Sequence, residues 1–146
     1  METGVMDFMA EIRKDFGLEE TDIRTYSPLT LAYVGDAVYE LIIRPLLAGK
    51  GNAQVNRLHK RASSLVNAGA QSDSLERIRE ALTEEELHVF RRGRNANSAT
   101  MAKHATMTDY RKATGFEALM GWLYLTGQTG RLLELVRLGL EDGAEF

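Results

Sequence analysis

The chain has 146 residues, of which 44% are hydrophobic and 27% are charged, and its formal net charge is −3. These values predict a globular protein with one domain over residues 1–146. The absence of cysteine excludes disulfides, thiolate zinc sites and cysteine nucleophiles, and it fits the reducing cytoplasm where we expect the protein. The acidic N-terminus lacks the pattern of a secretory signal, and no apolar run is long enough to span a membrane, so we expect no membrane partner.

Hydrophobic residues recur at helical spacing along nearly the whole chain, which predicts an all-α fold with about seven helices. The first expected helix is short and ends at Gly17. A second starts at Ser27 and Pro28, which are typical of the N-cap and first helical positions, and runs to about residue 48. Pro45 lies inside it and predicts a kink or a local break.

The rest of the chain continues this helical pattern. Two helices are expected over residues 53–82, with a break or close packing point at 68–70. Residues 83–86 form a capping box that starts a helix at Glu84, and this helix ends near Gly93. Residues 95–105 have no apolar period and predict an exposed loop. Further helices are expected over residues 109–126 and 132–140.

The helix that begins near Leu29 is almost entirely apolar, yet it carries Asp36 in its middle and Glu40 one turn later. An ionised carboxylate on a buried helix is costly unless a cation meets it. Two interpretations remain open. The acid favours the helix dipole or forms a surface pair with Arg44, or it holds a metal ion.

A second apolar helix also carries one embedded acid, Glu117. If the two helices pack together, Asp36 and Glu117 can share a divalent cation, and Gly35 and Gly121 would let the helix backbones approach closely. Magnesium binds through one or two carboxylates, with water and phosphate oxygens as the other ligands. This arrangement is the one that a phosphodiester hydrolase needs.

Positive charge is concentrated in one part of the chain. Residues 91–112 contain six basic residues against one acid, whereas residues 1–30 contain three basic residues against seven acids. Such asymmetry indicates a face for a polyanion, although the arginines after residue 90 also suit a helix C-terminus. No aromatic residue lies within residues 91–98, which favours recognition of a duplex backbone. The candidate phosphate contacts are Arg91, Arg92, Arg94 and Lys103, with Arg57, Lys60 and Arg61 as secondary candidates.

Several segments resemble the ribonuclease III endonuclease domain. Residues 31–40 are similar to the signature helix of that family, and residues 116–121 are similar to its second acidic helix. Residues 61–66 and the basic segment at 92–94 follow in the expected order. Residues 92–96 and 110–119 resemble the short bacterial branch, Mini-ribonuclease III, which has no separate double-stranded-RNA-binding domain. The resemblance covers about residues 27–140.

The resemblance implies a magnesium-dependent endoribonuclease that cleaves double-stranded RNA, with Asp36 and Glu117 as catalytic residues and Mg²⁺ ligands. It also implies a ribosomal RNA precursor as substrate, that of the large subunit (23S). Two acidic positions of the family hold Ala32 and Thr114 instead, neither of which supplies a carboxylate. Thr114 can order a water, and Glu40 and Asp109 are candidates to take the place of the absent acids. These departures leave open a non-catalytic RNA- or ribosome-binding module that retains the fold.

The sequence also predicts that two chains assemble. Cutting both strands of a duplex calls for two sites, and a two-fold homodimer matches the symmetry of the antiparallel strands. The family resemblance implies such a dimer, formed around the signature helix. Apolar side chains occupy nearly all sides of that helix, which favours an interface on part of residues 29–47, or else complete burial inside the monomer. These side chains are Tyr33, Val34, Ala37, Val38, Leu41 and Ile42.

Overall fold

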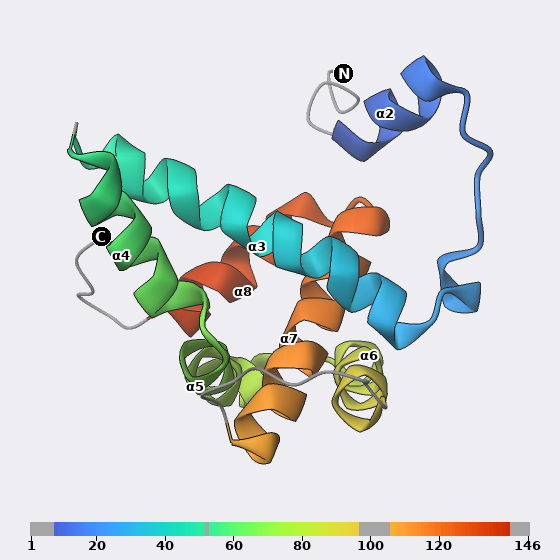
Figure 1. Ribbon diagram of the computed structural model, residues 1–146. Coiled ribbons are helices and arrows are strands. Elements are labelled where there is room, and N and C mark those ends of the chain that lie inside the picture. Colours follow the sequence, from blue (N-terminus) through green and yellow to red (C-terminus); the bar gives the residue numbers. More distant parts are fainter. Residues whose placement is uncertain (1–7, 52, 97–105, 141–146) are drawn as a thin grey trace.

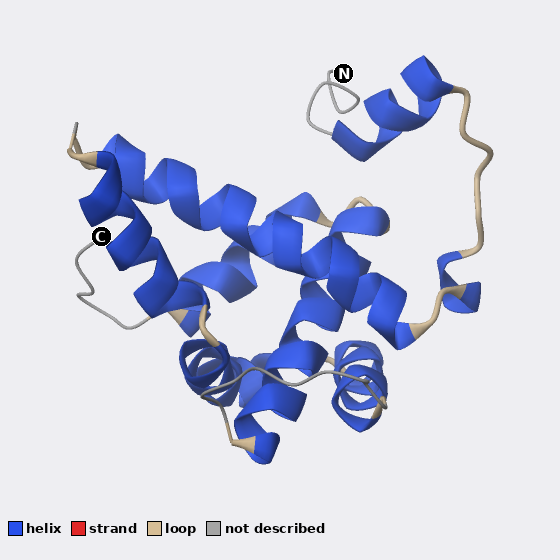
Figure 2. Cartoon of the chain, in the orientation of Figure 1, coloured by secondary structure: helices blue, strands red, loops and turns tan. Residues whose placement is uncertain are grey.

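The computed structural model describes residues 8–51, 53–96 and 106–140. These residues form helices and connecting loops and contain no strand, so the all-α prediction is confirmed (Figures 1 and 2). The helices are α2 (Phe8–Phe16), α3 (Pro28–Gly49), α4 (Val55–Val66), α5 (Ala68–Ile78), α6 (Glu84–Asn95), α7 (Met107–Leu125) and α8 (Thr129–Gly139). Short 3₁₀ turns lie at Ile23–Thr25 and Arg79–Ala81. No helix of these ranges is both long and apolar enough to cross a membrane.

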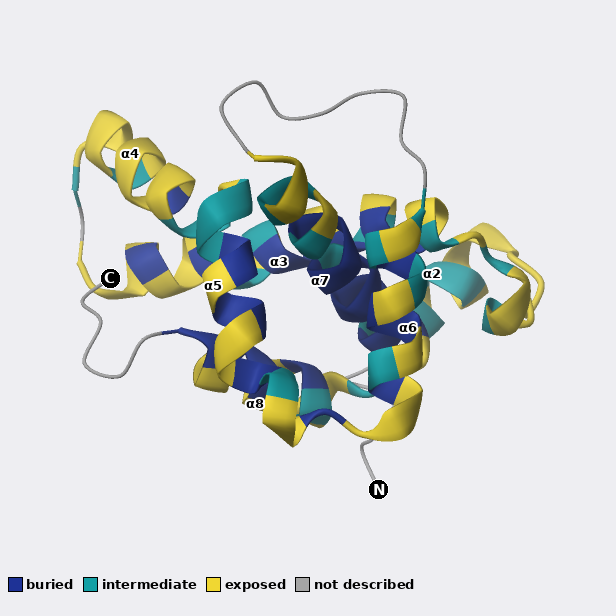
Figure 3. Ribbon diagram, turned by 90° about the horizontal axis from the view of Figure 1, so that it is seen from below, coloured by how far each residue is buried: buried dark blue, intermediate teal, exposed yellow. Residues whose placement is uncertain are grey.

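Helix α7 is the centre of the molecule. It is buried along most of its length from Ala113 to Leu125, and it packs against α3, α5, α6 and α8. In Figure 1, α3 crosses α7, and α5 and α6 lie on either side of it. Figure 3 shows the buried residues gathered around α7. The rings of Tyr39 on α3 and Phe116 on α7 meet edge to face, 5.2 Å between centroids.

Two glycines set the crossing of α3 and α7. A Cβ atom on Gly35 would overlap the main-chain carbonyl of Glu117, and one on Gly121 would overlap the carbonyl of Leu31. The two backbones are therefore in direct contact, as the sequence predicts, because neither glycine has a side chain to hold them apart. This contact fixes where Glu117 lies along α3.

The predicted helix starts at Ser27 and Thr83 are confirmed, but the predicted local break at Pro45 is wrong. The last two helices begin two and three residues earlier than predicted, at Met107 and Thr129. The Ser27 hydroxyl accepts a hydrogen bond from the Thr30 amide at 3.1 Å, and the capping box at the start of α6 is complete. Helix α3 continues through Pro45 to Gly49. The proline removes only the hydrogen bond to the Leu41 carbonyl, and both residues lie on an exposed face where water can replace the lost donor.

Candidate active site

The crossing of α3 and α7 brings Asp36 and Glu117 together. Asp36 directly follows the contact glycine on α3 and is exposed, whereas Glu117 is half-buried. The two carboxyl groups interact directly. Burial, followed by the charge and contact of Asp36 and the charge of Glu40, raises the pKa of Glu117 to about 8. Like charges therefore converge at this point of the fold.

Gln71 completes the contacts of Glu117 and is a residue that sequence reasoning missed. It lies on the first turns of α5 and is only 1% exposed. Its amide nitrogen donates to Oε2 of Glu117 at 3.4 Å and acts to lower the pKa of that carboxyl. Nothing in the local pattern marks this glutamine, because its partner lies 46 residues away in the sequence.

The predicted surface pair between Asp36 and Arg44 does not form. Arg44 instead pairs with Glu40 at 3.1 Å, one helical turn away. No salt bridge of the described residues engages Asp36 or Glu117. Two carboxylates that no described cation engages are the donor set that a hard divalent cation prefers.

The described residues contain no cluster of three or more His, Cys, Asp or Glu side chains that could hold a metal. Two carboxylates alone still fit Mg²⁺, since this ion keeps several waters and binds proteins through only one or two carboxylates. Glu40 lies close enough to act on Glu117 but is engaged by Arg44. Asp109 is half-buried and lies eight residues before Glu117, about 12 Å along the helix axis, so it does not join the pair.

Ala32 and Thr114 each lie about one turn before the acid on their own helix, and both are buried. Ala32 packs into the apolar core. The Thr114 hydroxyl donates to the main-chain carbonyl of Tyr110 at 3.0 Å. Its oxygen is left with lone pairs that can accept from a water, so its predicted role in ordering water stays a prediction.

A model of the ribonuclease III domain family matches residues 29–128. The chain belongs to the ribonuclease III family. It is 47% identical to a Mini-ribonuclease 3 of Clostridium tetani, with 87% of each chain covered. It is 43% identical to a Mini-ribonuclease 3 of a Thermoanaerobacter species, with 97% of each covered. The chain is thus an endoribonuclease of the ribonuclease III type.

The fold agrees with this membership. A crystal structure of a Fusobacterium nucleatum protein is similar to the chain with a TM-score of 0.75 and 34% identity, covering 81% of this chain and 96% of the other. The prediction of a ribonuclease III-type helical fold is therefore confirmed.

Arg91, Arg92 and Arg94 all lie on α6, which ends two residues beyond the predicted end near Gly93. Helix α6 continues to Asn95, because the last turn still closes its hydrogen bonds past Gly93. Arg91 is exposed, whereas Arg92 and Arg94 are half-buried. The Arg94 guanidinium lies 5.5 Å from the centre of the Phe90 ring and donates to the Asn95 side chain. Lys103 lies outside the described residues.

The secondary candidates Arg57, Lys60 and Arg61 are all exposed on α4. All three are distant from the acids in the sequence, and only two of them lie at the same pocket. Arg57 and Arg61 line a pocket where α4 meets the end of α3, whereas Lys60 does not line it.

Proposed function

We propose that this ribonuclease III-type chain is a Mg²⁺-dependent enzyme that cleaves double-stranded RNA, with Asp36 and Glu117 as its catalytic metal ligands. The observation that carries the proposal is the meeting of these two carboxylates, neither of which forms a salt bridge with a described residue. When bound, Mg²⁺ supplies a coordinated water of lowered pKa and offsets negative charge on the phosphate that is attacked.

Other residues of the chain have supporting tasks in this proposal. Gln71 holds the Glu117 carboxylate in place through its amide. The Thr114 oxygen accepts a hydrogen bond from a water, since its proton is already given to a carbonyl. Phosphates of the RNA are bound by the basic candidates Arg91, Arg92, Arg94, Lys103, Arg57, Lys60 and Arg61.

Two variants test the catalytic assignment. Asp36→Asn and Glu117→Gln should each reduce cleavage of a structured RNA duplex by more than about 100-fold, beyond the loss from removing a residue that merely orients a ligand. Both should still bind the duplex without magnesium. Asp109→Asn, which removes a half-buried carboxylate from the same helix as Glu117, is the matched control and should cleave normally. Full activity of either site variant would overturn the assignment and favour the non-catalytic module.

The proposal includes a homodimer built on α3. Tyr33 is 81% exposed and Leu41 is 58% exposed, and the exposed Ala37 lies between them at four-residue spacing. These residues form one apolar stripe along the helix, so the alternative of complete burial inside the monomer does not hold. A two-fold axis through this stripe would place two copies of Asp36 toward one duplex.

Sedimentation equilibrium at micromolar concentration tests the dimer. Tyr33→Asp and Leu41→Glu should shift the mass from dimer to monomer and abolish paired cuts on the two strands. Leu133→Glu, at a 47% exposed position of α8, is the matched control. A dimer that only Leu133→Glu dissociates would move the interface to α8.

The natural substrate in this proposal is the precursor of large-subunit (23S) ribosomal RNA, processed in the cytoplasm. The support is the likeness to bacterial Mini-ribonucleases 3. Sequencing of RNA ends in cells that carry Glu117→Gln tests it, because unprocessed ends of that precursor should accumulate. Accumulation confined to other transcripts would contradict this substrate.

A further inference from the structure

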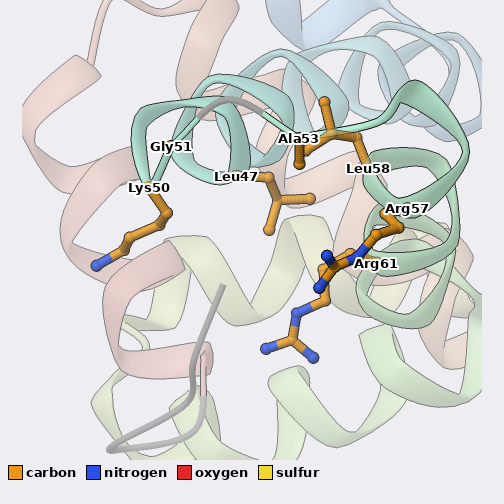
Figure 4. A pocket seen from close by; sticks show the side chains of 7 residues that line it. All are labelled: Leu47, Lys50, Gly51, Ala53, Arg57, Leu58 and Arg61. Carbon is orange, nitrogen blue, oxygen red and sulfur yellow. The ribbon is translucent and has the colours of Figure 1, made fainter.

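A pocket of about 340 Å³ lies where the C-terminal end of α3 meets the first half of α4. Figure 4 shows Lys50 on one side of it and Arg57 and Arg61 on the other, with the Leu47 side chain between them. The lining thus combines the positive groups of Lys50, Arg57 and Arg61 with an apolar surface made by Leu47, Ala53 and Leu58. Such a lining suits an anion that is attached to a less polar group.

The charge of this region is one-sided. Residues 41–72 contain five basic residues and no acid, although the whole chain has a net charge of −3. Arg57 and Arg61 are one turn apart on α4, so both point toward the same side of the helix. No salt bridge among the described residues engages either guanidinium. Their donors are therefore available for an external acceptor.

The pocket lies on the side of α3 that also carries the acids. Leu47 follows Asp36 by eleven residues, which is three full helical turns, so the two residues share one face about 16 Å apart along the axis. Helix α4 leads back from the pocket through Asn67 to α5, where Gln71 contacts Glu117. An extended polyanion that reaches the acids along this face would meet the pocket a few phosphates away.

We propose that this pocket binds a phosphate group of the RNA substrate at a distance from the cleaved bond. Arg57 and Arg61 bind the phosphate oxygens, since a guanidinium presents two parallel N–H donors to such an anion. Lys50 adds a point charge, and the apolar lining contacts the attached ribose. This inference rests on the proposed cleavage of RNA and adds an anchoring point that acts on binding and register, not on the chemical step.

Duplex binding without magnesium tests the anchor separately from catalysis. Arg57→Ala and Arg61→Ala should each raise Kd about 10-fold and reduce the salt slope by about one. In cleavage assays the loss of kcat/KM should come mainly from a higher KM, whereas failure of the active site would lower kcat. Arg57→Lys should recover only part of the affinity, because lysine cannot bind bidentately.

Two control variants make the result specific to the pocket. Arg137→Ala removes an exposed arginine from α8, outside the pocket, and should change Kd by less than about 2-fold. Lys60→Ala removes the same charge from α4 itself and should weaken binding less than Arg57→Ala. Equal losses in Lys60→Ala and Arg57→Ala would overturn the pocket and leave only the general field of α4.

A set of duplexes, each with one neutral methylphosphonate linkage, tests the position of the anchor. One linkage several nucleotides from the cut should weaken binding to the unaltered chain but not to the Arg57→Ala, Arg61→Ala double variant. Inorganic phosphate and a nucleoside monophosphate are titrated alone as a second arm. If either binds the pocket at micromolar concentration and no linkage is sensitive, the pocket serves a free phosphate compound and the RNA anchor is overturned.

Discussion

Glu86 and Glu117 are both set into the helical core, yet their surroundings move their pKa values in opposite directions. Glu86 is 3% exposed, and the Arg131 guanidinium donates two hydrogen bonds of 2.8 Å to its two oxygens. These bonds, assisted by the Thr83 amide, lower the pKa of Glu86 below its ordinary value. Burial and the Asp36 carboxylate instead raise the pKa of Glu117 to about 8.

The two glutamates differ in their partners: Glu86 is paired within the fold, whereas Glu117 faces another acid. Glu86 closes the capping box of α6 and joins it to α8 through a cation that the chain itself supplies. Glu117 is brought against a second carboxylate, an arrangement that gains nothing for the fold. In the proposed mechanism, the free energy that the fold does not recover at Glu117 is available to Mg²⁺ from solution.

Removing the Arg131 guanidinium that pairs with Glu86 should have the largest effect on stability. Arg131→Ala leaves the Glu86 carboxylate buried without its partner and should lower the free energy of unfolding by about 3 kcal/mol. Urea titration at pH 7 measures it, and Arg137→Ala on the same helix is the control. Adding Glu86→Gln to Arg131→Ala should restore part of the loss, because the unpaired charge is removed. No recovery in the double variant would show that the ion pair is not the cause.

Much of this architecture follows from local sequence signals. The Ser27 cap, the capping box and the glycine contact between α3 and α7 are all predictable, because each depends on residue types at short spacing or on missing side chains. The meeting of Asp36 and Glu117 follows from that contact, since each acid lies beside a residue of the crossing.

The remaining features depend on partners that are distant in sequence. The capping box already accounts for Glu86, so no local sequence pattern predicts its pairing with Arg131, 45 residues later. Gln71 reads as an ordinary polar residue until the packing of α5 on α7 places it against Glu117. The stacking of Arg94 near Phe90 likewise requires a helix that continues past the glycine where the pattern ends it.

Magnesium should stabilise the site formed by Asp36 and Glu117 and leave the Glu86–Arg131 pair unchanged. At about 100 times its dissociation constant, Mg²⁺ should raise the free energy of unfolding by about 2.7 kcal/mol. Differential scanning fluorimetry in chelator and in magnesium measures this as a rise in Tm. The rise should vanish in Asp36→Asn and Glu117→Gln and persist in Arg131→Ala, which keeps both acids. An undiminished rise in Glu117→Gln would place the ion elsewhere on the chain.

The pH dependence of stability should show the smallest effect, with opposite signs at the two glutamates. The raised pKa of Glu117 means that the folded chain holds this proton more tightly than the unfolded chain. Its contribution is therefore complete below the ordinary value of 4.5 and is lost as pH rises through about 8. Glu86 has a lowered pKa, so its contribution is present above 4.5 and is lost as pH falls through the lowered value.

Urea titrations from pH 3 to pH 9 in chelator separate the two contributions. Glu117→Gln should flatten the loss of stability between pH 4.5 and 8, and Glu86→Gln should flatten the loss on the acid side. The Glu117 effect should be well below what a pKa of about 8 alone implies, because the side chain is only half-buried and water screens part of the repulsion from Asp36. Saturating magnesium should abolish the Glu117 slope in the unaltered chain, since the cation replaces the proton between the two carboxylates. If the free energy of unfolding of Glu117→Gln still falls between pH 4.5 and 8, another group causes the fall. Glu117 would then not differ from Glu86 in the way proposed here.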